Sequence, residues 1–184
     1  MDLMCFAMNE IDRWGEIYND LNIKDIMWQP SYLKLWHIHG DGTPFLIYFQ
    51  DEYGSIIYAF LKRDLASIKF IPDTISKNYF DITTPYGYGG PLVRLSDNSK
   101  IDYLIQDWRL AFSGFCKNNN IISEFIRFHP VLENHKYFVN RSGINIETAN
   151  YVVYVDLMIP EEQIWKNYEY NNQKNIKKAK RSGI

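Results

Sequence analysis

Apolar side chains recur at helical spacing in three parts of the chain, and this pattern predicts a helix in each. They occupy every third or fourth position over residues 9–21 and 30–39, and they form one continuous stripe over residues 100–117. Asn9 suits the cap of the first helix, and Pro30 suits the first turn of the second.

Shorter apolar runs between these helices predict strands. Residues 44–50 and 55–62 flank a turn at 51–54, a pattern that is typical of an antiparallel hairpin. Further expected elements are strands over 66–72, 78–84 and 121–128, a helical turn over 129–138, and one or two strands over 144–157. Helices, a hairpin and then a helix–strand alternation favour an α/β fold with a mixed, partly antiparallel sheet flanked by helices.

The end of the chain follows a different pattern. Residues 151–157 are apolar on both faces, which suits a strand covered on both sides. A helix is expected over 160–181, but its apolar stripe is thin and bordered by lysines. We therefore expect residues 151–184 to lie outside the core of the first domain.

Composition narrows the class of protein. The chain has 184 residues, of which 46% are apolar and 23% charged, with a net charge of −2, and this excludes a disordered or nucleic-acid-coating chain. No apolar run is long enough to span a membrane, and the N-terminus lacks the basic start of a signal peptide. Cys5 and Cys116 show no metal-binding spacing, so we expect two free thiols and a cytoplasmic protein.

The segment Tyr86–Pro91 has the composition of a binding loop. Three of its residues are glycines, which permit positive φ and a close approach of a ligand to the backbone. Tyr86 and Tyr88 add ring faces and hydroxyls, which suit a sugar or a peptide. The alternative is a tight turn between sheet elements, and the spacing matches no phosphate-binding motif.

Two further segments carry candidate chemistry. His129 follows an expected strand and precedes a proline, so it could act as a base, orient another group, or be a satisfied buried side chain. No serine-hydrolase or zinc motif accompanies it. Residues 166–181 are strongly basic, which suits either a solvated helix or contact with phosphate groups.

In order, the motifs D-I-T-T-P-Y-G-Y-G-G-P, F-I-R-F-H-P, Y-V-V-Y-V-D-L and N-N-Q-K-N-I-K-K-A-K-R-S-G-I resemble the Fem family. That family comprises bacterial peptidoglycan-bridge aminoacyltransferases and related GNAT-like acyltransferases of envelope and polysaccharide loci. The resemblance covers residues 28–184 and implies a first GNAT-like domain over 1–148. Residues 149–184 would then open a second, truncated GNAT-like domain. The family often has an Arg where Gln173 stands.

The resemblance implies acyl transfer to an amine of a cell-envelope precursor. Aminoacyl-tRNA or acyl-CoA would be the donor, without a covalent cofactor or a metal. We expect the acceptor to contact Trp28, Gln29, Tyr32, Tyr86, Tyr88, Gly89, Gly90, Arg127 and His129. The donor's phosphates would contact Lys174, Lys177 and Lys178.

Because the family's second half would bind the donor, the 184-residue chain alone is expected to be inactive. Two alternatives remain. The chain could be a non-catalytic module that binds a glycan or a peptide, or a structural domain that dimerises through its final helix.

Overall fold

The computed structural model describes residues 2–21, 23, 25–72, 74, 77–141 and 143–184. The chain divides into two compact units, residues 1–146 and 147–184, which we describe separately. The division lies two residues before the expected boundary at 148/149. That the second unit opens a GNAT-like domain remains a prediction.

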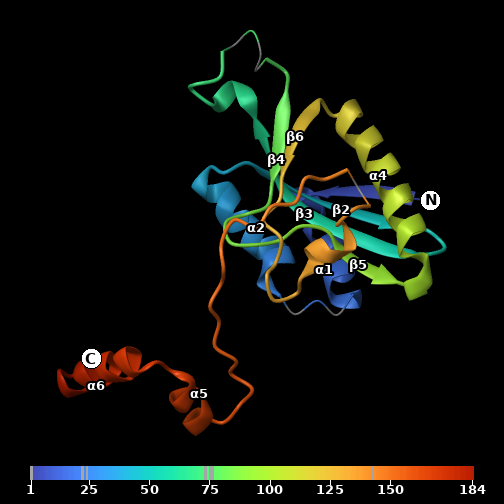
Figure 1. Cartoon of the computed structure of the whole chain (residues 1–184). Coiled ribbons are helices and arrows are strands. Elements are labelled where there is room, and N and C mark those ends of the chain that lie inside the picture. Colours follow the sequence, from blue (N-terminus) through green and yellow to red (C-terminus); the bar gives the residue numbers. More distant parts are fainter. Residues whose placement is uncertain (1, 22, 24, 73, 75–76, 142) are drawn as a thin grey trace. The chain divides into compact units, whose positions relative to one another are not determined.

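The first unit is built on one mixed sheet (Figure 1). Its strands run in the order β1-β2-β3-β4-β6, with β5 also paired to β3. All pairs are antiparallel except the β4–β6 pair, which confirms the expected mixed, partly antiparallel α/β sheet. The strand bounds are Asp2–Ala7 (β1), Thr43–Gln50 (β2), Gly54–Asp64 (β3), Phe80–Thr83 (β4), Leu92–Leu95 (β5) and Ile121–Phe125 (β6).

Two strands, β4 and β5, pair with different parts of β3. Its start, residues 54–57, pairs with β5, and its end, residues 61–64, pairs with β4. The chain therefore leaves the sheet after β4 and rejoins it at β5. The connecting residues, 84–91, contain the glycine- and tyrosine-rich segment.

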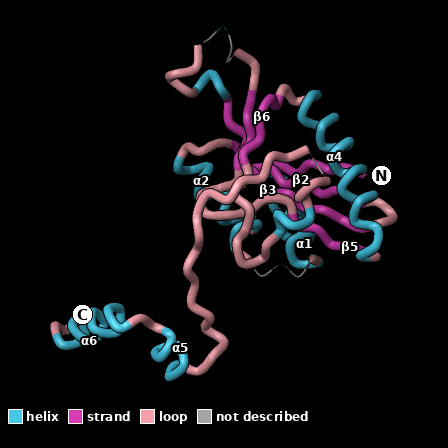
Figure 2. The backbone as a smooth tube through the Cα atoms, in the orientation of Figure 1, coloured by secondary structure: helices cyan, strands magenta, loops and turns pink. Residues whose placement is uncertain are grey.

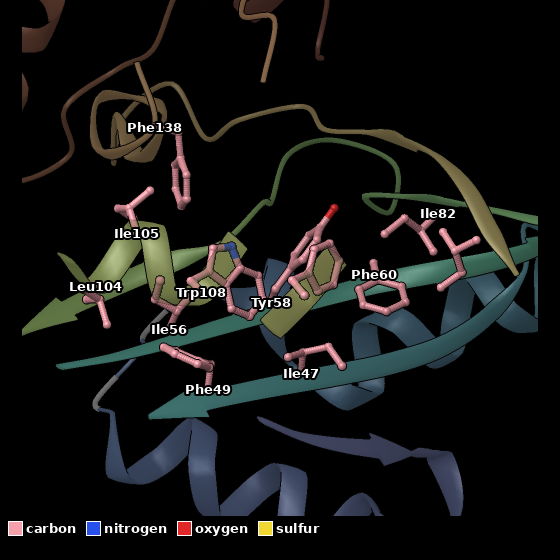
Figure 3. Close-up of a cluster of buried hydrophobic side chains, with 12 residues drawn as sticks. Ile47, Phe49, Ile56, Tyr58, Phe60, Ile82, Leu104, Ile105, Trp108 and Phe138 are labelled. Atoms are coloured by element: carbon pink, nitrogen blue, oxygen red, sulfur yellow. The ribbon is translucent and has the colours of Figure 1, made fainter. Parts of the chain in front are cut away.

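Helices cover both faces of the sheet (Figure 1). Helices α1 (Ile11–Asp20) and α2 (Pro30–His39) pack on one face, and α4 (Ile101–Asn118) packs on the other. Alternate side chains of β3 serve the two layers, since Ile57, Ala59 and Leu61 belong to the α1–α2 core. Ile56, Tyr58 and Phe60 belong to the α4 core, which Figure 3 shows in close-up. Burial on both faces explains why β3 reads as an unbroken apolar run.

The second unit contains two short helices, α5 (Glu161–Asn167) and α6 (Tyr170–Arg181). The prediction of one helix over 160–181 was wrong, because Tyr168 and Glu169 are extended and separate the two. The side-chain amide of Gln173 donates to the carbonyls of Trp165 and Tyr168, at 2.9 and 3.1 Å. These bonds satisfy carbonyls at the end of α5 that a continuous helix would have used.

Two predicted strands are absent. Residues 65–67 form a 3₁₀ turn and the described residues that follow, up to Ile71, are irregular, so the strand over 66–72 was wrong. Residues 144–157 form no strand and belong to a loop (Figure 2), with Tyr151 and Val153 almost fully exposed. Their apolar pattern suits a strand that is buried on both faces. A strand must pair with a neighbouring strand, and the described residues of the second unit form no strand with which it could pair.

Two real strands, β1 and β5, were not predicted. Both are short, and both lie where the chain pairs with only one neighbour. The strand expected over 121–128 ends at Phe125 and continues only as a single bridge between Gly89 and Phe128. Within the described residues, no helix has the length and apolar character needed to cross a membrane.

Candidate functional site

Glycines shape the segment that links β4 to β5. Gly87 and Gly90 both have φ of +89°, a conformation that side chains other than glycine rarely adopt. A Cβ on Gly90 would lie 2.8 Å from Cγ2 of Ile126, which is too close for a real contact. Gly89 and Gly90 are buried, so these glycines serve the turn and its packing rather than a ligand-facing surface.

Side chains from two distant parts of the chain hold this segment in place. The indole Nε1 of Trp28 donates to the carbonyl of Gly90 at 3.0 Å. The side-chain amide of Asn134 donates to the carbonyls of Gly89 and Pro91, at 2.9 and 3.1 Å. Trp28 and Asn134 are almost completely buried, so these bonds are shielded from water. Asn134 was not predicted as a site residue.

The segment presents one aromatic ring to solvent. Tyr86 is 70% exposed, and its ring centroid lies 5.2 Å from that of Trp36 on α2. The hydroxyl of Tyr32 donates to the carbonyl of Tyr86 at 2.9 Å, and its ring lies against the edge of Trp36. The predicted residues Tyr32 and Tyr86 therefore share one surface, to which Trp36 adds a ring that the prediction lacked.

The ring of His129 lies near those of Trp28 and Tyr88, and both of its ring nitrogens are engaged. Nε2 lies 3.0 Å from Oδ2 of Asp25, and Nδ1 lies 3.1 Å from the backbone nitrogen of Leu132. A backbone N–H can only donate, so Nδ1 is the acceptor and Nε2 carries the proton that is donated to Asp25. His129 is thus a satisfied side chain, and its ring packs edge-on to the ring of Tyr88. The other oxygen of Asp25 accepts from the backbone N–H of Met27.

Two other predicted residues make their polar contacts elsewhere. The side-chain amide of Gln29 donates to the hydroxyl of Tyr18 at 3.1 Å. The guanidinium of Arg127 lies over the ring of Phe125, with 5.1 Å between its Cζ and the ring centroid. Both contacts lie outside the rings of Tyr32, Trp36 and Tyr86, so Gln29 and Arg127 belong to the surroundings of the aromatic surface.

The predicted phosphate contacts are on α6 in the second unit. Lys174, Lys177 and Lys178 are exposed, and none forms an ion pair within the described residues. Lys177 places its ammonium 5.6 Å from the ring centroid of Trp165. Their contact with a donor remains a prediction.

The two cysteines are free, as predicted. Burial is the main cause that raises the pKa of both Cys5 and Cys116 to about 11, so both sulfurs are protonated at neutral pH and are poor nucleophiles. Among the described residues, no group of three or more acidic, histidine or cysteine side chains is placed to hold a metal ion.

Comparison of the chain with protein-family models, curated proteins and solved structures gave no match. Its function is therefore inferred from its own residues.

Proposed function

We propose that the first unit is the acceptor-binding part of an aminoacyl- or acyltransferase with a GNAT-like fold. The acceptor would be an amine of a cell-envelope precursor, either peptidoglycan or polysaccharide. One observation carries the proposal, which is the exposed ring of Tyr86 on a segment held rigidly by buried hydrogen bonds. A large exposed aromatic on a fixed loop is a common anchor for ligands.

The fold and the chemistry agree with this function. A mixed sheet with helices on both faces supports a GNAT-like assignment. In the reaction, the amine nitrogen would attack the acyl carbon, the ester or thioester bond would break, and a proton would leave the amine. This requires an aligned amine, a proton acceptor and donors for the oxyanion. Because both His129 nitrogens are engaged, we assign His129 to positioning Tyr88 rather than to proton transfer.

The donor would be aminoacyl-tRNA or acyl-CoA, bound in part by the lysines of α6. Both donors carry phosphate groups, which attract exposed ammonium groups. Because both are made in the cytoplasm, the proposal places the protein there.

The second candidate is a non-catalytic module that binds a glycan or a peptide. The packing of the exposed Tyr86 ring against Trp36, at an interplanar angle of 36°, favours it, because neighbouring aromatic rings suit the apolar face of a sugar. The two candidates differ at α6. Only a transferase is expected to bind coenzyme A or tRNA, with binding lost when Lys174, Lys177 and Lys178 are changed to Gln.

Calorimetric titration with a soluble nucleotide-linked muramoyl peptide and with polysaccharide fragments would test the acceptor site. Tyr86→Ala is expected to weaken binding about tenfold, which corresponds to about 1.4 kcal/mol. Tyr86→Phe keeps the ring and should bind nearly as well as the wild type. Tyr103→Ala removes an exposed tyrosine of α4 and serves as the matched control. Equal binding by Tyr86→Ala and the wild type, or no binding of any precursor, would reject the acceptor site.

A further inference from the structure

Two cavities that share part of their lining lie on the α1–α2 side of the sheet, at the end that the helices do not cover. Their volumes are about 700 and 380 Å³. They have Asp20, Leu21, Ser55 and Arg94 in common, so we treat them as one groove, called here the β5 groove. The larger cavity includes Asp25 and Leu132, which contact His129, but none of the rings of Tyr32, Trp36 and Tyr86 lines either cavity, so the groove adjoins the aromatic surface without including it.

The floor of the β5 groove is set by strand register. Tyr48, Ile57 and Leu92 lie opposite one another on β2, β3 and β5 and form an apolar row. Two residues further along each strand, the side chains that lie opposite one another on the same face are polar, namely Gln50, Ser55 and Arg94.

Gln50 and Arg94 of the polar row are exposed, whereas Ser55 between them is buried. Gln50 accepts a hydrogen bond from the hydroxyl of Tyr48 at 3.1 Å. A missing partner therefore matters most for Ser55, because burial of a polar group without a hydrogen bond costs free energy.

Several polar groups of the groove have no partner among the described residues. Asp20 and Arg94 form no ion pair, either with each other or with another described side chain. Ser55 is 7% exposed, and its hydroxyl makes no hydrogen bond to a described residue. Asp51 uses Oδ1 to accept the N–H groups of Tyr53 and Gly54, while its Oδ2 is buried and has no described partner.

We infer that the β5 groove binds a small zwitterion, either an amino acid or a short peptide with free termini. The exposed carboxylate of Asp20 suits an ammonium group, and the exposed guanidinium of Arg94 suits a carboxylate. The hydroxyl of Ser55 provides a further donor beside Arg94.

The rest of the lining and the size agree with this ligand. Apolar side chains from β3, β5 and neighbouring loops offer contact to an aliphatic side chain, namely Leu21, Ile23, Ile57, Leu92 and Leu132. The larger cavity alone has the volume of a typical small-molecule site, roughly 300–1,000 Å³. Asp20 and Arg94 place opposite charges in the lining of both cavities, which favours a ligand with both charges over a neutral sugar.

An NMR titration of the full chain with the dipeptide alanyl-leucine would test this inference. N-acetyl-alanyl-leucine lacks the ammonium group, and alanyl-leucine amide lacks the carboxylate. Saturable shifts at residues of the β5 groove are expected with the free dipeptide. Each blocked peptide should bind about tenfold more weakly, as expected for one lost charge-assisted contact.

Two charge variants assign the ends of the ligand. Arg94→Gln should abolish the preference for the free carboxylate over the amide, and Asp20→Asn should abolish the preference for the free ammonium. Asp12→Asn on α1 and Lys117→Gln on α4 change exposed charges elsewhere and should preserve both preferences. Far-ultraviolet circular dichroism verifies that each variant is folded.

The inference fails if the free dipeptide gives no saturable shift at millimolar concentration. It also fails if the blocked peptides bind as well as the free one, or if Arg94→Gln and Asp20→Asn retain the wild-type preferences. Because no variant alters Tyr86 and no acyl donor is used, the result is independent of the proposed transferase.

Discussion

Asn134 is the side chain on which the order of the candidate site most depends, and its removal is a severe test. Its amide donates to two carbonyls of the glycine-rich segment, and its Oδ1 accepts from the backbone N–H of His129 at 2.8 Å. Asn134 is only 1% exposed to solvent. Asn134→Ala therefore leaves two buried carbonyls and one partly buried N–H group without this partner.

The expected cost follows from those three bonds. Each is worth about 1 kcal/mol net, and a buried group left unsatisfied costs about 1–3 kcal/mol. Allowing for some access of water, we expect Asn134→Ala to lower the free energy of unfolding by about 2–4 kcal/mol. For a chain of this size the melting temperature should fall by roughly 5–15 °C.

Thermal unfolding monitored by tryptophan fluorescence measures this loss. Asn118→Ala, an exposed change at the end of α4, is the control and should stay within about 0.5 kcal/mol of the wild type. Amide hydrogen exchange should also accelerate over residues 86–91 in Asn134→Ala. A variant as stable as the control, with unchanged exchange, would refute the role assigned to Asn134.

Asn134→Asp adds a pH dependence to the same test. A buried carboxyl group facing two carbonyls would have its pKa raised above the usual value of about 3.9. The folded variant would then retain its proton to a higher pH than the unfolded chain does. Stability should be greatest below about pH 4 relative to Asn134→Ala, and should be lost as the pH rises through the folded pKa.

The remaining predictions concern the α4 side of the sheet and the second unit. Burial raises the pKa of Glu124, and Arg109 at 3.3 Å offsets part of this rise. In urea denaturation, the free energy of unfolding should therefore fall as the pH rises from about 4.5 through the pKa of Glu124 in the folded protein. Glu124→Gln should remove this fall, and Arg109→Met should make it continue to higher pH. Gln173→Ala should speed tryptic cleavage within α6, because the end of α5 loses its two side-chain bonds, whereas Asn172→Ala, an exposed neighbour, should not.

The main elements of the sheet could be predicted because turn residues mark their ends. Residues 51–54 separate β2 from β3 although β3 shows no alternation of apolar and polar positions. Helices α1, α2 and α4 could be predicted from the 3.6-residue period of their apolar positions. By contrast, β5 directly follows the irregular segment that ends at Pro91, and its four residues show no alternation that would distinguish them from that segment.

The failure at the second unit has a different cause. Trp165, Tyr168 and Ile176 keep helical spacing across the break, and neither proline nor glycine marks it. The break is stable because the amide of Gln173 satisfies the exposed carbonyls. The hydrogen bonds of Gln173 form only in the folded structure, so the spacing of the apolar residues cannot predict them.

The aromatic surface could be predicted in part, whereas its supports could not. Glycines and tyrosines within one short segment indicate a turn with exposed rings, so Tyr86 could be found from composition. Asp25 precedes one short 3₁₀ helix and Asn134 begins another, and both are polar residue types that are common in solvated segments. They become important because the fold places them against His129 and the buried carbonyls of residues 89 and 91.

The β5 groove shows why some sites require the strand register. In the sequence, Gln50 and Arg94 look like ordinary solvent-facing positions at the ends of strands. The register places them on either side of Ser55, on the face that carries the α1–α2 core. A polar row on that face indicates a binding site only when the neighbouring apolar row is known to be part of the α1–α2 core. The groove therefore follows from where α1 ends, at Asp20, and α1 supplies a carboxylate at that end.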